Sequence, residues 1–311
     1  MLVHRTKDLN MKNEQNWPVL NFAEMQDTIE TLHQWIQIVG KIRLKTMPWQ
    51  NHSWHTTLYV TPTGYSTHGI SFQGRIFQID FNFKTHKLLI QCSNAETLIM
   101  DLKPRTVANF YTELFEKLSS IGIAVTIYSK PNEMDPAIPF SENVINKSYD
   151  PNVANALWRA MLKVNGVFNE FRSDFVGKAS PVHLFWGAFD LAVTRFSGNP
   201  APLHQGGMPN MPLDVMQEAY SQEVCSAGFW PGSKDSPIPV FYAYPSDPHF
   251  AAQKILPKAA FYSPEMGEFF LKYEDVQNSE NPEKTVLDFL HTTYAAAANT
   301  SKWDRATLEK K

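Results

Sequence analysis

The sequence has little of what marks several large classes of protein, beginning with basic charge. Its 311 residues include 28 Lys and Arg against 31 Asp and Glu, which gives a formal net charge of −3 and a pI of about 6.4. Nucleic-acid-binding domains usually carry a basic face and a pI above about 9. The charge balance therefore predicts no nucleic-acid partner.

Cysteine and long hydrophobic runs are scarce as well. The two cysteines, Cys92 and Cys225, lack Cys or His partners at zinc-finger spacing and lie in apolar, strand-like runs. A free Cys in such a run behaves as a small buried hydrophobe, which favours a reducing compartment. No stretch reaches the roughly 18–20 apolar residues of a membrane helix, and residues 1–10 lack the apolar segment of a signal peptide. We therefore expect a soluble, cytoplasmic protein with no membrane partner.

Apolar residues make up 43% of the chain and aromatic residues 13%, enough for a large core. Single cores stop growing near 250–300 residues, so one large domain and two closely packed halves both fit. Residues 1–16 are expected to be disordered or tag-like. The first half, residues 17–130, then shows a helix over 22–44, strands over 75–83, 87–92 and 96–102, a helix from Thr106 to about Gly122, and a strand over 123–128.

A proline-rich connector, residues 131–149, leads to a second half, residues 150–300. Asp150-Pro151 predicts a helix start, and apolar spacing continues to about residue 176. One aromatic strand is expected over 182–196, then a loop over 197–212, strands over 223–230, 239–244 and 267–273, and a helix from Asn281-Pro282. Residues 301–311 form a charged tail that is expected to fray. The fold class is α+β with antiparallel sheets.

Both halves read as a long helix, a proline break, a histidine entering an aromatic strand, further strands and a closing helix. The entries are PWQNHSW from Pro48 and PVHLFW from Pro181. This order predicts an internal duplication of two helix–strands–helix units. Because sequence identity between the halves is negligible, a chance match of element order remains the alternative.

Recognisable catalytic motifs are absent: there is no GxGxxG, GxxxxGK[ST], HExxH, GxSxG or CxxC. His52 and His55 are predicted to lie on one strand, where they face opposite sides and cannot share a metal. His52, His183 and Glu223 could hold a metal if the halves brought them together, but the spacing does not require one, so we predict none. Otherwise each histidine is a hydrogen-bonded structural residue.

His183 and Arg195 are predicted on one face of the 182–196 strand, among Phe, Leu and Val. A buried basic group there costs several kcal/mol unless it is paired. Arg195 therefore has either a carboxylate partner or a small anionic ligand. Asp190, on the other face, is also expected to be paired, with Arg43, Arg172 or Lys178 as the candidates.

Aromatic side chains concentrate on the strands, where they form a core or line a ligand pocket. The loop over 197–212 is long enough for a lid hinged at glycines, or is a rigid surface loop. The ligand-binding candidates are His52, Trp54, His183, Trp186, Arg195, Glu223 and Trp230.

Several runs resemble an uncharacterised, mostly bacterial family catalogued as a domain of unknown function. They are WPVL, VGKIRL, PWQNHSWH, LYVTPTGYST, GKASPVHLFWGAFDLAVTRFSG, SAGFWPG and the final TYAAAA with WDR. The resemblance spans about residues 17–308 and implies a soluble protein, without a reaction, ligand, cofactor or catalytic residue. Members of that family often carry a histidine where this chain has Gln222, which argues against a metal or acid–base role there.

Two functions from different classes stay open. The first is an enzyme or small-molecule-binding protein with a site between the two halves. The second is a non-catalytic interaction protein whose polar residues only satisfy one another. Polar side chains that converge on an open pocket would favour the first, and complete internal pairing would favour the second.

Overall fold

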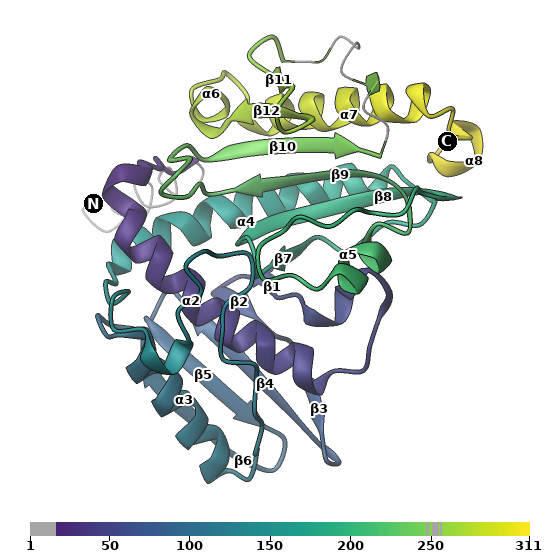
Figure 1. Ribbon diagram of the computed structural model, residues 1–311. Coiled ribbons are helices and arrows are strands. Elements are labelled where there is room, and N and C mark those ends of the chain that lie inside the picture. The colour runs from purple at the N-terminus through teal and green to yellow at the C-terminus, as the bar shows by residue number, and fades with distance from the viewer. Residues whose placement is uncertain (1–16, 247–248, 251–254, 256) are drawn as a thin grey trace, which may run out of the picture.

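The computed structural model describes residues 17–246, 249–250, 255 and 257–311, so the expected disordered or tag-like segment lies outside the described residues. Helices surround two antiparallel sheets, which confirms the α+β class. In Figure 1 the second sheet lies across the top, the first sheet lies below, and the long helix α2 crosses between them.

Helix α2 (Phe22–Thr46) confirms the helix predicted over 22–44. Every residue from Gln34 to Arg43 is buried, so this part of the helix is enclosed on all sides. Trp35 stacks on Phe110 with ring centroids 4.7 Å apart. Because polar groups buried with such a helix need partners, its glutamines and basic residues must be bonded to the segments packed around it.

The first sheet contains β1 (Tyr59–Thr61), β2 (Gly64–Ser66), β3 (Ile70–Phe72), β4 (Arg75–Asn82), β5 (Lys87–Cys92) and β6 (Ala95–Asp101). Their order is β1-β2-β4-β5-β6, with β3 also paired to β4. Alternation along β4 buries Phe77, Ile79 and Phe81, as predicted. Helix α3 (Val107–Ser120) follows, and the Thr106 hydroxyl accepts from the Asn109 amide (3.1 Å) as its N-cap.

The strand predicted over 123–128 is wrong. Ile123 and Ile127 are buried, but the described residues 123–128 have no regular secondary structure. Alternating burial makes a strand only where a neighbouring strand supplies a hydrogen-bonded ladder, and none pairs here. The connector expected over 131–149 contains only a short 3-10 turn, η2 (Phe140–Glu142).

Helix α4 (Pro151–Ser173) begins where the Asp150-Pro151 signal places it, and the Asp150 carboxylate accepts from the Asn152 amide (2.7 Å). The single strand predicted over 182–196 is wrong, because the chain forms a hairpin of β7 (His183–Phe185) and β8 (Asp190–Pro200). The turn between them places Phe189 at φ 66°. The run is apolar at nearly every position, so its pattern contains no break that would reveal the turn.

The second sheet adds β9 (Gln222–Trp230), β10 (Val240–Pro245), β11 (Phe261–Ser263) and β12 (Glu268–Lys272), in the order β11-β12-β10-β9-β8-β7. A short helix α5 (Leu213–Ala219) precedes β9, and α6 (Tyr273–Gln277) follows β12. Helices α4 and α7 (Pro282–Thr300) cover one face of this sheet (Figure 1). The chain ends in α8 (Arg305–Leu308).

The charged C-terminal residues pack against the protein, so the expectation that they fray is not supported. The Trp303 side chain is buried, Glu309 forms a bridge with Phe175, and the Lys310 amide donates to the Asp174 carbonyl (3.0 Å). Tryptophan burial and these backbone bonds fix a segment that composition alone assigns to solvent. In the part of the chain that the structure describes, no helix is long and apolar enough to cross a membrane.

The two halves share a continuous core. Leu58 of the first half forms a bridge with Leu184 of the second, and the Trp186 indole donates to the Thr56 carbonyl (2.9 Å). The strand orders of the two sheets differ, since β3 branches from β4 in the first and β11 lies outside β12 in the second. The predicted duplication is therefore unconfirmed.

Candidate functional site

The two faces of the second sheet differ in character. The face covered by α4 and α7 is apolar and buried, with Leu191, Val193, Phe229 and Phe241 fully enclosed. The opposite face carries polar side chains on four adjacent strands: Asp190 and Thr194 on β8, Ser226 on β9, Tyr242 and Tyr244 on β10, and Glu268 on β12. Together with Glu133 and Tyr220, which reach it from loops, these residues form what we call the acidic face.

Asp190 is anchored by a tyrosine two strands away. The Tyr242 hydroxyl donates to Asp190 Oδ2 at 2.5 Å, crossing over β9 at Gly228, which pairs with both Tyr242 and Ala192. A Cβ at Gly228 would lie 2.2 Å from the Tyr242 hydroxyl oxygen. The glycine is therefore required by the bond that crosses it.

Glu133 enters the site from the connector, and α2 holds it there. Gln37 donates to the carbonyls of Asn132 (2.9 Å) and Gly187 (3.1 Å) and accepts from the Asn132 amide (2.9 Å). His33 Nε2 lies 2.9 Å and 2.8 Å from the carbonyls of Trp186 and Gly187. These bonds fix the connector above the β7–β8 turn, where a Cβ on Gly187 would lie 1.8 Å from Glu133 Oε1.

A chain of hydroxyl groups completes the acidic face. The Tyr220 and Tyr244 hydroxyl oxygens are 3.1 Å apart, and those of Thr194 and Ser226 are 2.9 Å apart. The Tyr242 and Tyr244 rings stack with centroids 5.9 Å apart. Trp230, at the end of β9, donates to the Ala188 carbonyl (3.1 Å) and borders the same face. Aromatic rings thus surround the carboxyl groups.

The three carboxyl groups are held in an environment that disfavours their charge. Burial, reinforced by the charge of Asp190, raises the pKa of Glu133 to about 7 and that of Glu268 to about 7. Burial raises the pKa of Asp190 to about 6, against the opposing effect of the Tyr242 hydrogen bond. Among the described residues, none of the three forms an ion pair within 4 Å, and neither glutamate has a side-chain hydrogen bond.

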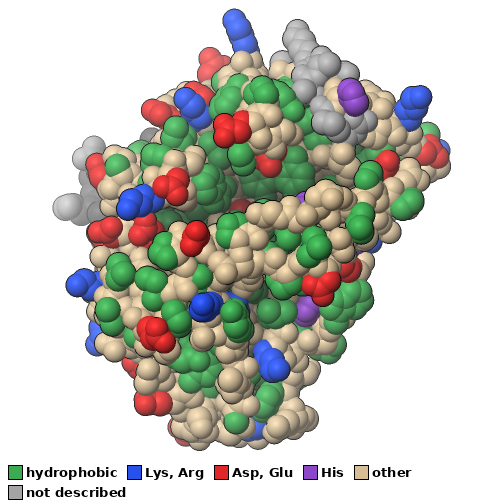
Figure 2. Space-filling view, in the orientation of Figure 1, with side chains coloured by type: hydrophobic (Ala, Val, Ile, Leu, Met, Phe, Trp, Pro, Cys, Tyr) green, Lys and Arg blue, Asp and Glu red, His purple; other side chains and the backbone are tan. Residues whose placement is uncertain are grey.

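The molecule is hollowed beside these strands. Figure 2 shows a recess below β10 and β12, bounded underneath by the chain segment that crosses the front of the molecule, with hydrophobic-class side chains, the class that includes tyrosine, on its wall. Apolar and aromatic walls with a few convergent polar groups are typical of ligand sites.

The segment over 197–212 is partly strand, because β8 continues to Pro200. Beyond Pro200 the loop is hydrogen-bonded to the connector. The Glu133 amide donates to the Pro209 carbonyl (2.9 Å). The Asn132 side chain donates to the Asn210 carbonyl (2.6 Å), and the Asn210 side chain donates to the Met134 carbonyl (2.8 Å). The loop therefore holds the backbone at Glu133, in addition to the bonds that α2 makes with Asn132. Whether it opens as a lid stays a prediction.

Arg195 lies on the apolar face, away from the recess. Its side chain is 1% exposed, its guanidinium donates to the Phe171 carbonyl, and it stacks over Phe171 with 3.5 Å from Cζ to the ring centroid. Tyr294 lies at 4.4 Å on another side. Burial lowers the pKa of Arg195 to about 10. The structure shows an aromatic cage where the sequence suggested a carboxylate or a ligand.

His183 and Arg195 do not share a face of one strand, contrary to the sequence prediction. His183 pairs with Ala192 across the β7–β8 hairpin, so it lies on the side of even-numbered β8 residues while Arg195 lies on the other. His183 is 1% exposed, its Nδ1 has no hydrogen-bond partner, and burial beside Arg43 lowers its pKa to about 3. It is a neutral, enclosed side chain.

His52 and Trp54 lie in a 3-10 turn, η1 (Asn51–Thr56), so the strand predicted for them is wrong. A φ of 56° at His52 excludes extended backbone there, and the Glu218 carboxylate accepts from its amide (2.8 and 2.9 Å). The His52 ring packs on Phe196 (4.6 Å) and Trp54 (5.3 Å). These two candidates form a separate cluster around Phe196, in the second half of β8.

The remaining candidates have structural partners. Trp186 is buried against Gly40 of α2, where a Cβ would lie 2.1 Å from its ring. Glu223 accepts from Ser197 Oγ (2.7 Å) and Asn199 Nδ2 (3.2 Å). Of the seven predicted residues, Trp230 borders the acidic face, and His183 lies on the same side of the sheet, enclosed on the edge strand β7. In the described residues, no group of three or more His, Cys, Asp or Glu is arranged to hold a metal, including His52, His183 and Glu223.

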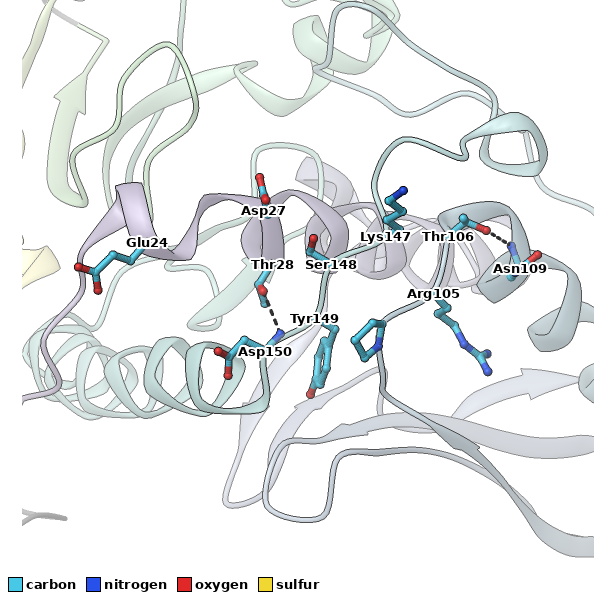
Figure 3. A pocket seen from close by; sticks show the side chains of 11 residues that line it. Glu24, Asp27, Thr28, Arg105, Thr106, Asn109, Lys147, Ser148, Tyr149 and Asp150 are labelled. Atoms are coloured by element: carbon cyan, nitrogen blue, oxygen red, sulfur yellow. Dashed lines mark hydrogen bonds between the residues drawn. The ribbon is translucent and has the colours of Figure 1, made fainter.

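An open groove lies elsewhere, between α2 and the starts of α3 and α4 (Figure 3). Its volume is about 730 Å³, and charged side chains of both signs line it, among them Asp27, Arg105 and Lys147. Internal bonds already engage its polar groups: Thr28 accepts from the Asp150 amide (2.9 Å), and Arg105 pairs with Glu113 (2.6 Å). Mixed charge and internal pairing make this groove the weaker site.

The family comparison agrees with the resemblance in the sequence. A family model described as a family of unknown function (DUF5996) matches residues 17–310, and the chain belongs to that family. Neither the curated proteins nor the solved structures contain a match. The function must therefore be argued from the acidic face itself.

Proposed function

We propose that the protein binds a small organic cation, an amine, in the recess over the acidic face, and that the carboxyl groups exchange protons with it. The observation that supports this most strongly is the set of three half-buried or buried carboxyl groups, Glu133, Asp190 and Glu268, with no described cation beside them. Buried charges in proteins are normally paired, and a bound cation would supply the missing partner.

The walls of the recess suit the same kind of ligand. Aromatic faces attract ammonium groups, and the rings of Tyr220, Tyr242, Tyr244 and Trp230 border the carboxyl groups. The hydroxyl groups of Thr194, Ser226 and the tyrosines offer hydrogen bonds that would orient a polar substituent. An amine with an apolar body and one further polar group fits this combination.

The pKa values support acid–base chemistry near neutral pH. A general acid or base works best when its pKa is close to the working pH, and carboxyl groups with pKa values near 6 to 7 meet that condition. A bound ammonium would stabilise the carboxylates and lower their pKa values. Binding would therefore release protons, and affinity would rise from about pH 5 to about pH 8.

The alternatives have weaker support. A small anionic ligand, predicted from Arg195, would need access that a side chain 1% exposed does not offer. A purely interacting protein would be expected to pair its polar groups internally, and the glutamates of the acidic face are not paired in this way. The free thiols of Cys92 and Cys225 favour a reducing compartment, and we propose the cytoplasm.

The proposal is tested by comparing matched ligands. A panel of organic amines, such as benzylamine and benzyltrimethylammonium, is compared with benzyl alcohol and benzoate by calorimetry and thermal shift at about pH 8. We expect the amines to bind and to raise the melting temperature. The substitutions Glu133→Gln and Glu268→Gln should each weaken amine binding. Glu265→Gln is the control, because Glu265 is exposed in the β11–β12 turn. Equal binding of alcohol or benzoate, or no amine binding, would refute the proposal.

A further inference from the structure

A second group of reactive side chains lies well away from Asp190. It is centred on Lys178, in the segment between α4 and β7, and on His52 of η1. Both pack on Phe196, six residues along β8 from Asp190. Six residues of extended strand span about 20 Å, so this group and Asp190 belong to different places.

The hydrogen bonds determine which nitrogen of His52 holds the proton. His52 Nδ1 lies 2.9 Å from the Ala219 carbonyl oxygen, which only accepts, so Nδ1 must carry hydrogen. Nε2 is then the unprotonated acceptor, and Lys178 Nζ lies 2.6 Å from it. Burial, and the charge of Lys178, lower the pKa of His52, which keeps the ring in this neutral form.

Among the described residues, Lys178 Nζ has two polar partners and no carboxylate within 4 Å. It donates to His52 Nε2 and to Gln222 Oε1 (2.9 Å) and lies over the rings of Phe196 (4.7 Å) and Trp54 (5.8 Å). Its charged neighbour is Glu218, whose carboxylate is occupied by the His52 amide. Partial burial lowers the pKa of Lys178, although Glu218 opposes this effect.

The backbone beneath this pair is strained. His52 and Ser53 both have left-handed φ values, 56° and 57°, which non-glycine residues rarely adopt. Such strain persists where the surroundings enforce it, and it is concentrated at functional sites. Here the Glu218 carboxylate and the Ala219 carbonyl hold the turn, and the result is a histidine aimed at the amine.

We propose that Lys178 is a nucleophilic amine that forms an imine with a small aromatic or apolar aldehyde, with His52 as its proton acceptor. A neutral amine that donates its two hydrogens to His52 and Gln222 has its lone pair free for attack. Nζ bonds to the carbonyl carbon, the π electrons move to oxygen, and one proton of the resulting ammonium passes through His52 Nε2 to that oxygen, which gives a neutral carbinolamine. The nitrogen lone pair then forms the C=N bond as the C–O bond breaks, and the hydroxyl leaves as water with the remaining Nζ proton, again relayed through His52. Amine and aldehyde thus give imine and water, and His52 ends in its starting form. The aromatic rings of Phe196 and Trp54 favour an aldehyde with an apolar body.

Reductive trapping on the full-length protein tests this inference. The protein is treated at neutral pH with a limiting amount of benzaldehyde and cyanoborohydride, and modified lysines are quantified by peptide mass spectrometry. Lys84 is the matched control within the molecule, because it also lies over an aromatic ring, that of Trp158 (5.7 Å), but is exposed. We expect Lys178 to be labelled several-fold faster than Lys84, and the difference to vanish in urea.

Two variants separate the roles. Gln222→Glu places a carboxylate beside Nζ, which stabilises the ammonium form and should slow labelling of Lys178 at neutral pH, with recovery at high pH. His52→Phe keeps an aromatic ring on Phe196 but removes the acceptor, and should also slow labelling. The inference is overturned if Lys178 reacts no faster than Lys84 in the folded protein. It is equally overturned if neither variant changes the rate.

Discussion

Replacing Glu268 by glutamine should stabilise the protein at alkaline pH. Most substitutions of partly buried side chains destabilise a protein, even when the new side chain has the same shape. Burial and the Asp190 charge raise the pKa of Glu268 from its ordinary value of 4.5 to about 7. The folded protein therefore binds more protons at this position than the unfolded chain between these two values. Stability from this group is greatest below the unfolded pKa and is lost as the pH rises through about 7.

The size of the effect follows from the shift. At about 1.4 kcal/mol per pKa unit, a rise from 4.5 to about 7 corresponds to at most about 3 kcal/mol in the free energy of unfolding. Because Glu268 is coupled to Asp190, the measured loss should be smaller, about 1–3 kcal/mol. Glutamine has nearly the same shape and no charge, so the variant should gain this amount at about pH 8 and little at about pH 5.

Urea unfolding followed by tryptophan fluorescence, at both pH values, measures the difference directly. Glu265→Gln removes the same charge from the exposed β11–β12 turn and should change stability by less than about 0.5 kcal/mol. If Glu268→Gln is destabilising at about pH 8, Glu268 has a cationic partner in the free protein. The acidic face would then be internally paired, and the reasoning behind the proposed ligand would be refuted.

Three further changes test other parts of the structure. Gly228→Ala should lower the free energy of unfolding in urea melts by about 1–3 kcal/mol and weaken amine binding, because the new Cβ meets the Tyr242 side chain. The same loss of stability when Gly228→Ala is made in a Tyr242→Ala variant would contradict this reason. Arg195→Met should cost less than about 2 kcal/mol, since no carboxylate is left unpaired, whereas Arg195→Ala should cost about 3 kcal/mol or more by leaving a cavity; equal losses would argue against the aromatic cage. A thiol reagent at neutral pH should modify Cys92 quickly and Cys225 only after unfolding, because Cys225 is buried and its pKa is raised to about 12; rapid loss of both thiols would contradict the fold.

Local signals in the sequence were enough for most helices and several strands. The apolar stripe of α2, the Thr106 and Asp150 caps and the alternation along β4 each depend on residues within a few positions of one another. The hairpin of β7 and β8 depends instead on α2, because His33 and Gln37 bind the carbonyls of the turn from 150 residues away. No local pattern carries that information.

The candidate site was predictable only in part for the same reason. Asp190 stood out as an acid inside an apolar strand, but its partner is Tyr242 rather than one of the basic residues considered. Glu133 lies in an irregular connector, where no periodic pattern marks it as buried. Glu268 is the first residue of a strand, a position where an acid normally faces solvent. A usable signal was present in Gly228, since a glycine inside a strand often marks a place where another group approaches closely.

The acidic face and the Arg195 cage show how burial alone fails to identify function. Arg195 is more deeply buried than any of the three carboxyl groups, yet its guanidinium donates to the Phe171 carbonyl and lies over three aromatic rings, which leaves the buried Nε without a hydrogen-bond partner in the described structure. The glutamates are less buried, but the described residues offer them no donor and no opposite charge. A buried charge held by a carbonyl and aromatic faces contributes to structure, whereas a carboxylate with no donor at the edge of a recess lowers stability unless something binds there. The cost of keeping Glu133, Asp190 and Glu268 together is the physical reason to expect a cationic ligand.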